Sequence, residues 1–199
     1  RAGDVIATIS GHTRDILKGE RIALNILQHI SGVATLTRTF VDLVKDLPVR
    51  IVDTRKTLPG LRFMQKYGVM IGGGYNHRFC LSDGILLKDN HIKAVGSIKE
   101  AVKRARKAHH LLRIEVETKS IDEVKEALES GVDVIMLDNM TIDQMAEAVR
   151  FISKRAIVEA SGGVTIQNIR DIAKTGVDII SIGALTHSVK AVDISMKIQ

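Results

Sequence analysis

The segments KSIDEVKEALESGVDVIM (residues 119–136) and VTIQNIRDIAKTGVDIIS (residues 164–181) share one pattern at an offset of 45 residues. Each begins near a hydroxyl side chain suited to cap a helix, continues as an amphipathic stretch, turns at Gly-Val-Asp and ends in an apolar run. This pattern predicts a helix followed by a buried strand, twice. Repetition of such a unit is typical of parallel sheets that curve into an α/β barrel.

The same alternation extends outward from these two segments. We expect strands at Val49–Asp53, Ile85–Lys88, Leu112–Thr118, Asp133–Leu137, Ala156–Glu159 and Asp178–Ile182. Helices are expected at Ser97–His109, Ile121–Ser130, Ile142–Ser153 and Ile166–Thr175. Near-continuous apolar strands separated by helices indicate a parallel sheet covered by helices. Because six or seven strands are fewer than the eight of a closed barrel, the fold class predicted is α/β, with an open, incomplete barrel (about seven-stranded) of TIM-like type.

The N-terminal part of the chain reads differently. Residues 20–47 place apolar side chains every three or four positions, which predicts a long helix ended by Pro48. Gly32 interrupts this stripe and marks either close packing or a break. Before the helix, Val5–Ile9 reads as a short strand. A lone strand is not stable by itself, so we expect it to belong to a domain that begins before Arg1.

Composition excludes several classes of protein. The 199 residues carry 29 Lys and Arg against 23 Asp and Glu, a net charge of +6, which suits anionic ligands. Six aromatic residues are too few for a base-stacking platform, so no nucleic-acid partner is expected. No apolar run is long enough to cross a membrane. The single Cys80, expected to be a buried small apolar residue, excludes a disulfide framework and favours a cytoplasmic location.

Cationic side chains follow the first two predicted strands of the barrel. Arg55 and Lys56 come directly after Val49–Asp53, and Lys88 ends the next strand. Between them lies Gly72–Arg78, whose three glycines allow close approach to a ligand or another chain and whose last residues are His77 and Arg78. Each feature alone is compatible with a solvated turn or a flexible loop. Together they indicate a ligand with at least two negative groups.

Acidic side chains and glycines follow the later strands. Glu115 and Glu117 share one face of their strand, and Asp138 follows the next strand. Carboxylates opposite a basic cluster suit Mg²⁺ and ribose hydroxyls, although either glutamate could instead pair with a lysine across the barrel. The last two strands end at Ser161-Gly162-Gly163 and Gly183-Ala184, where exposed backbone N–H groups favour a phosphate.

Several motifs together resemble one known family. They are ERIALNIL, DTRKTLPG, KYGVMIGGGYNHRFCLSDGILLKDNHI, IEVET, IMLDN, EASGGV and DIISIGALTHSVKAVDISMKI. They are similar to those of nicotinate-nucleotide pyrophosphorylase (carboxylating), also called quinolinate phosphoribosyltransferase, and the resemblance runs over almost the whole chain. It implies synthesis of nicotinate mononucleotide, pyrophosphate and CO₂ from quinolinate and phosphoribosyl pyrophosphate, with Mg²⁺, in de novo NAD synthesis.

The resemblance also implies a domain organisation. Residues 1–19 would be the end of a truncated N-terminal α/β sandwich, residues 20–190 an open seven-stranded barrel that carries catalysis, and residues 191–199 a strand returning to the N-terminal domain. The protein would be a homodimer or a higher homo-oligomer, with Arg21 completing the site of a neighbouring subunit.

Individual roles follow from matching motif positions. Arg55, His77, Arg78 and Lys88 would grip the two carboxylates of quinolinate, and Lys56 would lie near the pyrophosphate. Glu117 and Asp138 would serve the ribose and the metal. The 5′-phosphate region would comprise Ser161, Gly162, Gly163, Gly183 and Ala184. The catalytic group would be Lys56, Lys88, Glu117 and Asp138.

Two alternatives stay open on the residues alone. One is a related phosphoribosyltransferase that takes a pyridine with one carboxylate or serves another pathway. The other is a non-catalytic barrel that binds phosphate or supports assembly. The full set of cations disfavours the first, because unpaired buried arginines are costly. The presence of Lys88, Glu117 and Asp138 disfavours the second.

Overall fold

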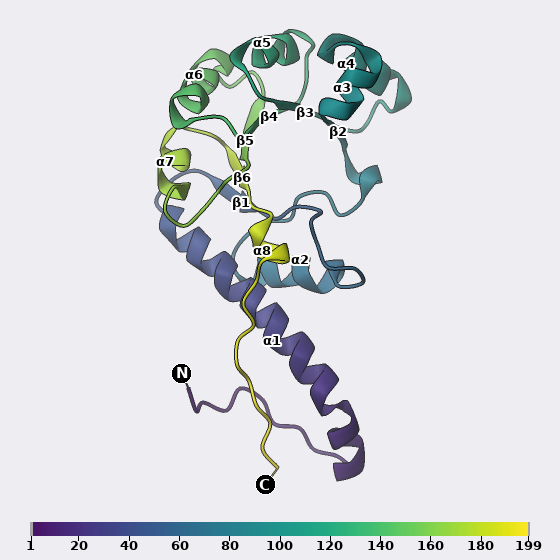
Figure 1. Ribbon diagram of the computed structural model, residues 1–199, viewed down its shortest axis with the longest axis vertical. Coiled ribbons are helices and arrows are strands. Elements are labelled where there is room, and N and C mark those ends of the chain that lie inside the picture. Colours follow the sequence, from purple (N-terminus) through teal and green to yellow (C-terminus); the bar gives the residue numbers. More distant parts are fainter. Residues whose placement is uncertain (1, 199) are drawn as a thin grey trace.

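A computed structural model describes residues 2–198 and shows an open α/β barrel (Figure 1). Six parallel strands pair in the order β1-β6-β5-β4-β3-β2. Their bounds are β1 Arg50–Val52, β2 Ile85–Leu87, β3 Ile114–Thr118, β4 Val134–Asp138, β5 Ile157–Ser161 and β6 Ile179–Ser181. Strands β1 and β2 do not pair, and the barrel is open between them. On that free edge of β1, Val52 forms a single parallel bridge with Tyr75, which stands where a seventh strand would lie.

Helices cover the outer side of the sheet (Figure 1). After the strands come α2 Arg62–Ile71, α3 Asp89–Val95, α4 Ile98–Ala108, α5 Ile121–Glu129, α6 Ile142–Ile152, α7 Ile169–Lys174 and α8 Ala184–His187, with a short 3₁₀ turn at Leu81–Asp83. The amphipathic helices bury one apolar stripe each, as Val124 and Ala127 of α5 and Met145 and Ala148 of α6 show. The predicted N-caps are present: Ser120 accepts from Glu123 N, and Thr141 accepts from Gln144 N.

The two repeated segments form equivalent structures, α5–β4 and α7–β6. In each, the aspartate of the Gly-Val-Asp turn accepts a hydrogen bond from the neighbouring strand, β3 for Asp133 and β5 for Asp178. Asp133 Oδ2 accepts from Ile114 N at 2.8 Å, and Asp178 Oδ2 accepts from Val158 N at 2.9 Å. The turn glycines have φ of +72° at Gly131 and +91° at Gly176, a region that disfavours other residues. The repeat therefore fixes strand register at the amino ends of the sheet.

A long helix, α1 Thr13–Val44, runs beside the barrel and projects beyond it (Figure 1). It begins seven residues earlier than the predicted start at residue 20. Only its C-terminal half packs on the core, through Val33, Phe40 and Val44. Gly32 marks close packing and no break, because a Cβ there would lie 2.3 Å from the carbonyl oxygen of Lys190.

Several predictions about elements were wrong. Val5–Ile9 forms no strand, and within residues 2–198 the C-terminal segment after α8 forms none either. That segment instead lies along α1, where Val192 N donates to Gln28 O at 3.0 Å and Gln28 Nε2 donates to Ile194 O at 2.7 Å. Helices α2, α3 and α8 were not predicted. No helix in the part of the chain described is long and apolar enough to span a membrane.

Candidate active site

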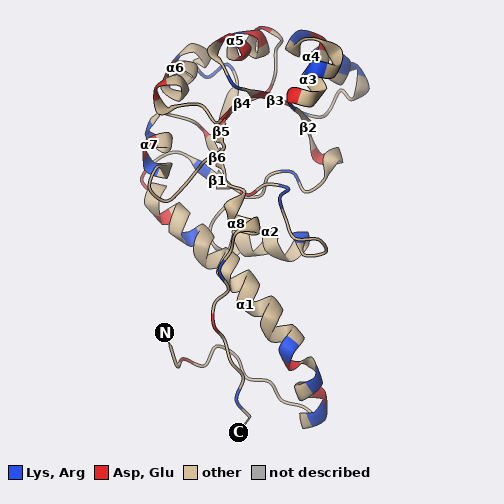
Figure 2. Cartoon of the chain, viewed as in Figure 1, with Lys and Arg blue, Asp and Glu red and all other residues tan. Residues whose placement is uncertain are grey.

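All six strands are parallel, so their carboxyl ends meet at one rim of the barrel, the usual place for chemistry in this architecture. Every predicted site residue except Arg21 lies at or directly after one of these ends or in the loop bridged to β1. Arg21 lies in the projecting half of α1, where charged residues gather away from the strand ends (Figure 2). The fold thus brings the predicted set together and leaves Arg21 outside its own chain's rim.

Two arginines lie near each other at the rim, close enough for the charge of one to act on the other. Arg78 donates from Nη1 to the carbonyl oxygen of Gly84 at 3.0 Å, and the Nε of Arg55 is buried with no hydrogen-bond partner. Burial, and then the charge of Arg55, lower the pKa of Arg78. A buried donor without a partner is costly, so this pair is suited to receive an anion.

His77 lies at the centre of a hydrogen-bond network. Its Nδ1 accepts from the backbone N–H of Arg78 at 2.8 Å, and its Nε2 lies 3.2 Å from Glu115 Oε2 and 3.6 Å from Glu159 Oε2. Burial lowers the pKa of His77, but the hydrogen bond to Glu115 and the charges of Glu159 and Glu115 outweigh it and raise the pKa overall. Because Nδ1 accepts a hydrogen bond, the ring proton lies on Nε2 and points at the two glutamates.

Glu115 and Glu159 are acids in the barrel interior. Burial and then the charge of Glu115 raise the pKa of Glu159 to about 7. Together with His77 these carboxylates offer donor atoms within 4.8 Å of one another, a spacing that could hold a metal ion. The Nε2 proton blocks the histidine lone pair, so the arrangement fits a hydrogen-bonded cluster better than a metal site. Glu159 was not predicted as a site residue, although an acid within an apolar strand is a usable signal.

A second acidic group lies at the rim beside Lys88. The Nζ of Lys88 lies 3.0 Å from Glu117 Oε2, and the glutamate side chain is only 11% exposed. On the next strand, Asp138 lies in register with Ser161 and is half-buried. The hydrogen bond to Asp89 raises the pKa of Lys119, and the charges of Asp89, Glu117 and Asp138 raise it further. Two carboxylates on neighbouring strands are a donor set that Mg²⁺ accepts when phosphate oxygens complete it.

The two glycine turns of the predicted phosphate region lie side by side. Ser161 pairs in register with Ser181, which places Gly162-Gly163 beside Gly183-Ala184. Gly162 has a φ of +89°, and a Cβ there would lie 2.3 Å from Asn139 Oδ1. The Cδ atom of Lys56 would lie 3.1 Å from a Cβ at Gly183. The aliphatic part of Lys56 therefore packs over this turn.

The glycine loop and Cys80 have surroundings that the sequence did not indicate. Gly72 and Gly74 allow the close approach of α1 of the same chain: a Cβ at Gly72 would lie 2.6 Å from Ala34 O, and one at Gly74 would lie 2.8 Å from Thr37 Cγ2. Cys80 is half-buried and polar in its contacts, with its Sγ 2.9 Å from Ser82 Oγ and 3.2 Å from Asp83 Oδ1.

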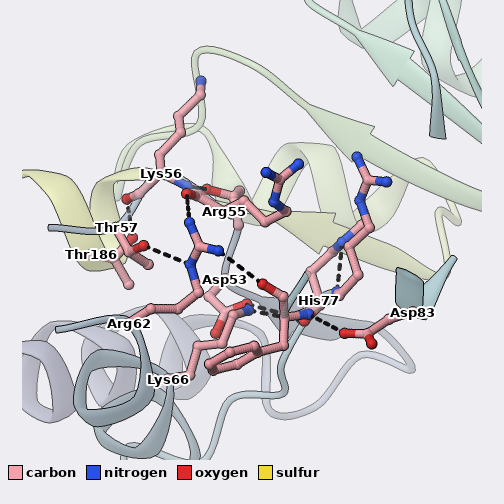
Figure 3. Close-up of polar contacts among 12 residues, drawn as sticks. Asp53, Arg55, Lys56, Thr57, Arg62, Lys66, His77, Asp83 and Thr186 are labelled. Carbon is pink, nitrogen blue, oxygen red and sulfur yellow. Dashed lines mark hydrogen bonds and ion pairs between the residues drawn. The ribbon is translucent and has the colours of Figure 1, made fainter. Parts of the chain in front are cut away.

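Sequence reasoning also missed a set of polar side chains beneath the two cationic loops. Figure 3 shows Arg62 and Lys66 of α2 on one side of the loop after β1, with Arg55 and Lys56 extending to the other side. Lys66 and Asp53 form a fully buried ion pair at 2.5 Å. Gln65 and Lys66 are consecutive polar residues, and nothing in the sequence indicates that both are buried.

Comparisons with known proteins identify the family of this chain. The model of the quinolinate phosphoribosyl transferase C-terminal domain matches residues 33–197, and that of the N-terminal domain matches residues 1–31. The chain is 49% identical over 197 residues to the probable nicotinate-nucleotide pyrophosphorylase [carboxylating] of Bacillus subtilis, covering 98% of this chain and 68% of that protein. The Mycobacterium leprae nicotinate-nucleotide pyrophosphorylase [carboxylating] is 43% identical, with 98% and 70% covered.

Solved structures agree as well. NadC from Streptococcus pyogenes superposes with a TM-score of 0.93 at 47% identity, covering 98% of this chain and 69% of that one. A nicotinate-nucleotide pyrophosphorylase from Pyrococcus furiosus shares the fold at 21% identity and a TM-score of 0.69. The chain thus spans about two thirds of the length of its curated relatives. Over that length, it belongs to the quinolinate phosphoribosyltransferase family.

Proposed function

We propose that the protein is a quinolinate phosphoribosyltransferase, which joins quinolinate to phosphoribosyl pyrophosphate and releases pyrophosphate and CO₂ in NAD synthesis. The observation that carries this proposal is the Arg55–Arg78 pair: a buried, unpartnered Arg55 Nε beside a second guanidinium whose pKa is lowered by burial and by Arg55. Such a site needs an anion, and two adjacent carboxylates on a flat ring suit the planar fork of arginine.

The reaction divides into two steps that this rim can support. The quinolinate nitrogen attacks C1 of the ribose, and the bond from C1 to pyrophosphate breaks with its electron pair going to pyrophosphate. The ring nitrogen is then cationic, so the bond to the 2-carboxylate can break, releasing CO₂ and leaving its electron pair on C2, which takes up a proton. Held geometry and charge account for most of the rate in such a reaction.

Roles for the side chains follow from where they lie. Arg55, Arg78, Lys88 and His77 are proposed to bind the quinolinate carboxylates. His77 can do so only by releasing one of its present partners, because Arg78 N and Glu115 occupy its two nitrogens. Lys88 lies against Glu117, so it can turn from the glutamate to the substrate.

Glu117 and Asp138 face the place proposed for the ribose. Positive charge grows on the ribose ring as pyrophosphate leaves, and two nearby carboxylates stabilise it. These two residues would also hold Mg²⁺, which supplies charge neutralisation for the phosphates when bound. Lys56 is proposed to contact pyrophosphate, because its stem packs over the Gly183 turn.

The 5′-phosphate is assigned to Ser161, Gly162, Gly163, Gly183 and Ala184. The support is their adjacency on the neighbouring strands β5 and β6. Glycine at these turns lets backbone N–H groups approach a phosphate closely.

A second subunit is part of the proposal. Arg21 lies on the projecting half of α1 and is exposed, so in a homodimer or higher homo-oligomer it could enter a neighbour's rim. We retain a cytoplasmic location, expected from the single cysteine, as part of the same proposal. No nucleic acid or membrane partner is included.

The test is an assay of the full-length protein with labelled quinolinate and phosphoribosyl pyrophosphate. We expect release of CO₂ and formation of nicotinate mononucleotide, both dependent on phosphoribosyl pyrophosphate. A parallel assay with nicotinate should show little product, because one carboxylate leaves a buried arginine unpaired. Preferential use of nicotinate would support the rival transferase. Phosphate binding without turnover of either acid would support the non-catalytic barrel.

A further inference from the structure

Helix α2 buries polar side chains beside Val69 and exposes most of its apolar ones, unlike a normal amphipathic helix. Gln65 and Lys66 are buried, whereas Phe63, Tyr67 and Met70 are more than half exposed. We propose that Arg62, Gln65 and Lys66, here called the α2 clamp, position the groups that bind the two substrates. Lys66 sets His77 and Arg78, here called the acid-binding loop. Gln65 sets Lys56 and the turn after β6, here called the phosphate-binding loop. The inference rests on the proposed function and adds residues to it.

Lys66 and Asp53 hold the backbone N–H and C=O of His77, which belong to the two peptide groups on either side of this residue. Asp53 Oδ1 accepts from His77 N at 2.9 Å, and Lys66 Nζ donates to His77 O at 2.9 Å while contacting Asp53 Oδ1 at 2.5 Å. The exposed fractions of the two side chains are 3% and 0%. The C=O of His77 belongs to the peptide that leads to Arg78, so the pair sets where both acid-binding side chains begin.

Gln65 holds the phosphate-binding loop. Its Oε1 accepts from Leu58 N at 2.9 Å, and its Nε2 donates to Thr186 O at 2.7 Å. Thr186 in turn donates from Oγ1 to Lys56 O at 2.7 Å. The chain Leu58–Gln65–Thr186–Lys56 therefore ties the loop after β1 to the turn after β6, where the phosphate groups are assigned.

Arg62 joins the two halves at the surface. Its Nε donates to Thr57 Oγ1 at 2.9 Å and its Nη1 to Phe79 O at 3.0 Å, so it links the loop after β1 to the segment beyond Arg78 (Figure 3). Arg62, Gln65 and Lys66 lie at helix spacings of three and four residues, which puts them on one face. One turn of helix thus reaches both loops.

A buried ion pair is weak evidence for stability, because desolvation cancels much of its attraction. Replacement by apolar residues of similar size would be expected at α2 if packing were its only task. Fixed hydrogen bonds to the N–H and the C=O of one residue give something that packing does not, a defined backbone orientation. A misplacement of about 1 Å at such a group can cost about 100-fold in rate.

The experiment compares Lys66→Met and Gln65→Leu in the full-length protein, with Lys125→Met as control. Gln65→Leu removes the bonds to Leu58 N and Thr186 O. Lys125 pairs with Asp122 on the exposed face of α5, outside the rim. We expect Lys66→Met to raise the KM for quinolinate about 10-fold and the KM for phosphoribosyl pyrophosphate by less than about 2-fold. Gln65→Leu should show the reverse split, with about a 5-fold rise for phosphoribosyl pyrophosphate. The control should change neither.

A companion variant covers the case in which Lys66→Met does not fold. Burial already raises the pKa of Asp53 against the opposing effect of Lys66, so the aspartate can become neutral when the lysine is gone. The double variant Asp53→Asn, Lys66→Met removes both charges and keeps a side-chain oxygen for His77 N. It should fold and show the same quinolinate-selective rise in KM.

The outcomes separate the two levels of the argument. Parallel rises in both KM values for both variants, or unchanged KM values in folded protein, would overturn the clamp. Absence of turnover and of quinolinate binding by calorimetry in the unmodified protein would instead overturn the proposed function. A merely structural role would lower the melting temperature without splitting the two KM values.

Discussion

Buried polar atoms without partners gather in the interior of this barrel and at its rim. In the stretch from residue 2 to 198 they are Arg55 Nε, Glu115 Oε1, Glu159 Oε1 and Ser181 Oγ. Elsewhere buried polar groups are bonded, as for Thr118, whose Oγ1 donates to Met136 O. Native proteins leave few such atoms, so their concentration marks the place where other atoms complete the network.

Lys88 is the first side chain to test within that network. Lys88→Ala removes the cation 3.0 Å from Glu117 and should lower kcat by roughly 100-fold. Steady-state kinetics with both substrates would measure the change. Lys103→Ala, on the exposed face of α4, is the matched control and should keep full activity. An unchanged kcat for Lys88→Ala would remove this residue from the site.

Glu159 gives a prediction in pH. Its pKa of about 7 lies above the ordinary 4.5, so folding favours its neutral form. The stability from this group is present below about pH 4.5 and is lost as pH rises to about 7, by at most about 3 kcal/mol. Urea unfolding from pH 4.5 to 8 should show this fall in the unmodified protein and a flatter profile in Glu159→Gln. Glu147→Gln, on the exposed face of α6, should retain the fall in stability with pH. Equal profiles for the two variants would contradict the assignment of this fall to Glu159.

At the scale of single elements, the repeated β-branched runs predicted all six strands to within a residue or two. Buried parallel strands need apolar side chains on both faces, and this requirement is visible in sequence. Helix α2 was missed because its exposed face holds Phe63 and Tyr67 while its buried face holds Gln65 and Lys66. An analysis of hydrophobic periodicity either misses such a helix or predicts that its exposed face is buried.

The same limit applies to the site. The cations and acids after each strand were identifiable because parallel strands bring their carboxyl ends to one rim. Asp53 and Lys66 were not, because their role depends on a contact between residues 13 positions apart that only the packing of α2 creates. The glycines at 72–74 were predicted to allow close approach to a ligand or another chain, since sequence cannot show that α1 of the same chain passes close to them.

The turn after β5 provides a prediction at this scale. Gly162→Ala would place a Cβ 2.3 Å from Asn139 Oδ1 at a φ of +89°. We expect a loss of about 1–3 kcal/mol in unfolding free energy and weaker binding of phosphoribosyl pyrophosphate. Gly131→Ala shares the positive φ, at +72°, but has open space around it. It should therefore show the smaller backbone cost alone, measured by chemical denaturation, and equal losses would exclude the clash with Asn139.

For the whole molecule, the placement of Arg21 predicts shared sites. Arg21→Ala and Lys88→Ala should each be nearly inactive, because each damages every site of a homo-oligomer. Mixing the two after subunit exchange should restore activity to about a quarter of the unmodified level, since half of the random dimers would carry one intact site. The readout is turnover before and after exchange. No recovery would place Arg21 in its own chain's chemistry or outside the chemistry altogether.

The turns around Asp133 and Asp178 lie at the amino ends of the strands, opposite the rim. Their carboxylates hold strand N–H groups and also pair with Arg106 and Lys154. Residues that stabilise the sheet and residues that bind substrate thus lie at opposite ends of the same strands. Substitutions at the amino ends can therefore change thermal stability while leaving turnover at the carboxyl ends unchanged.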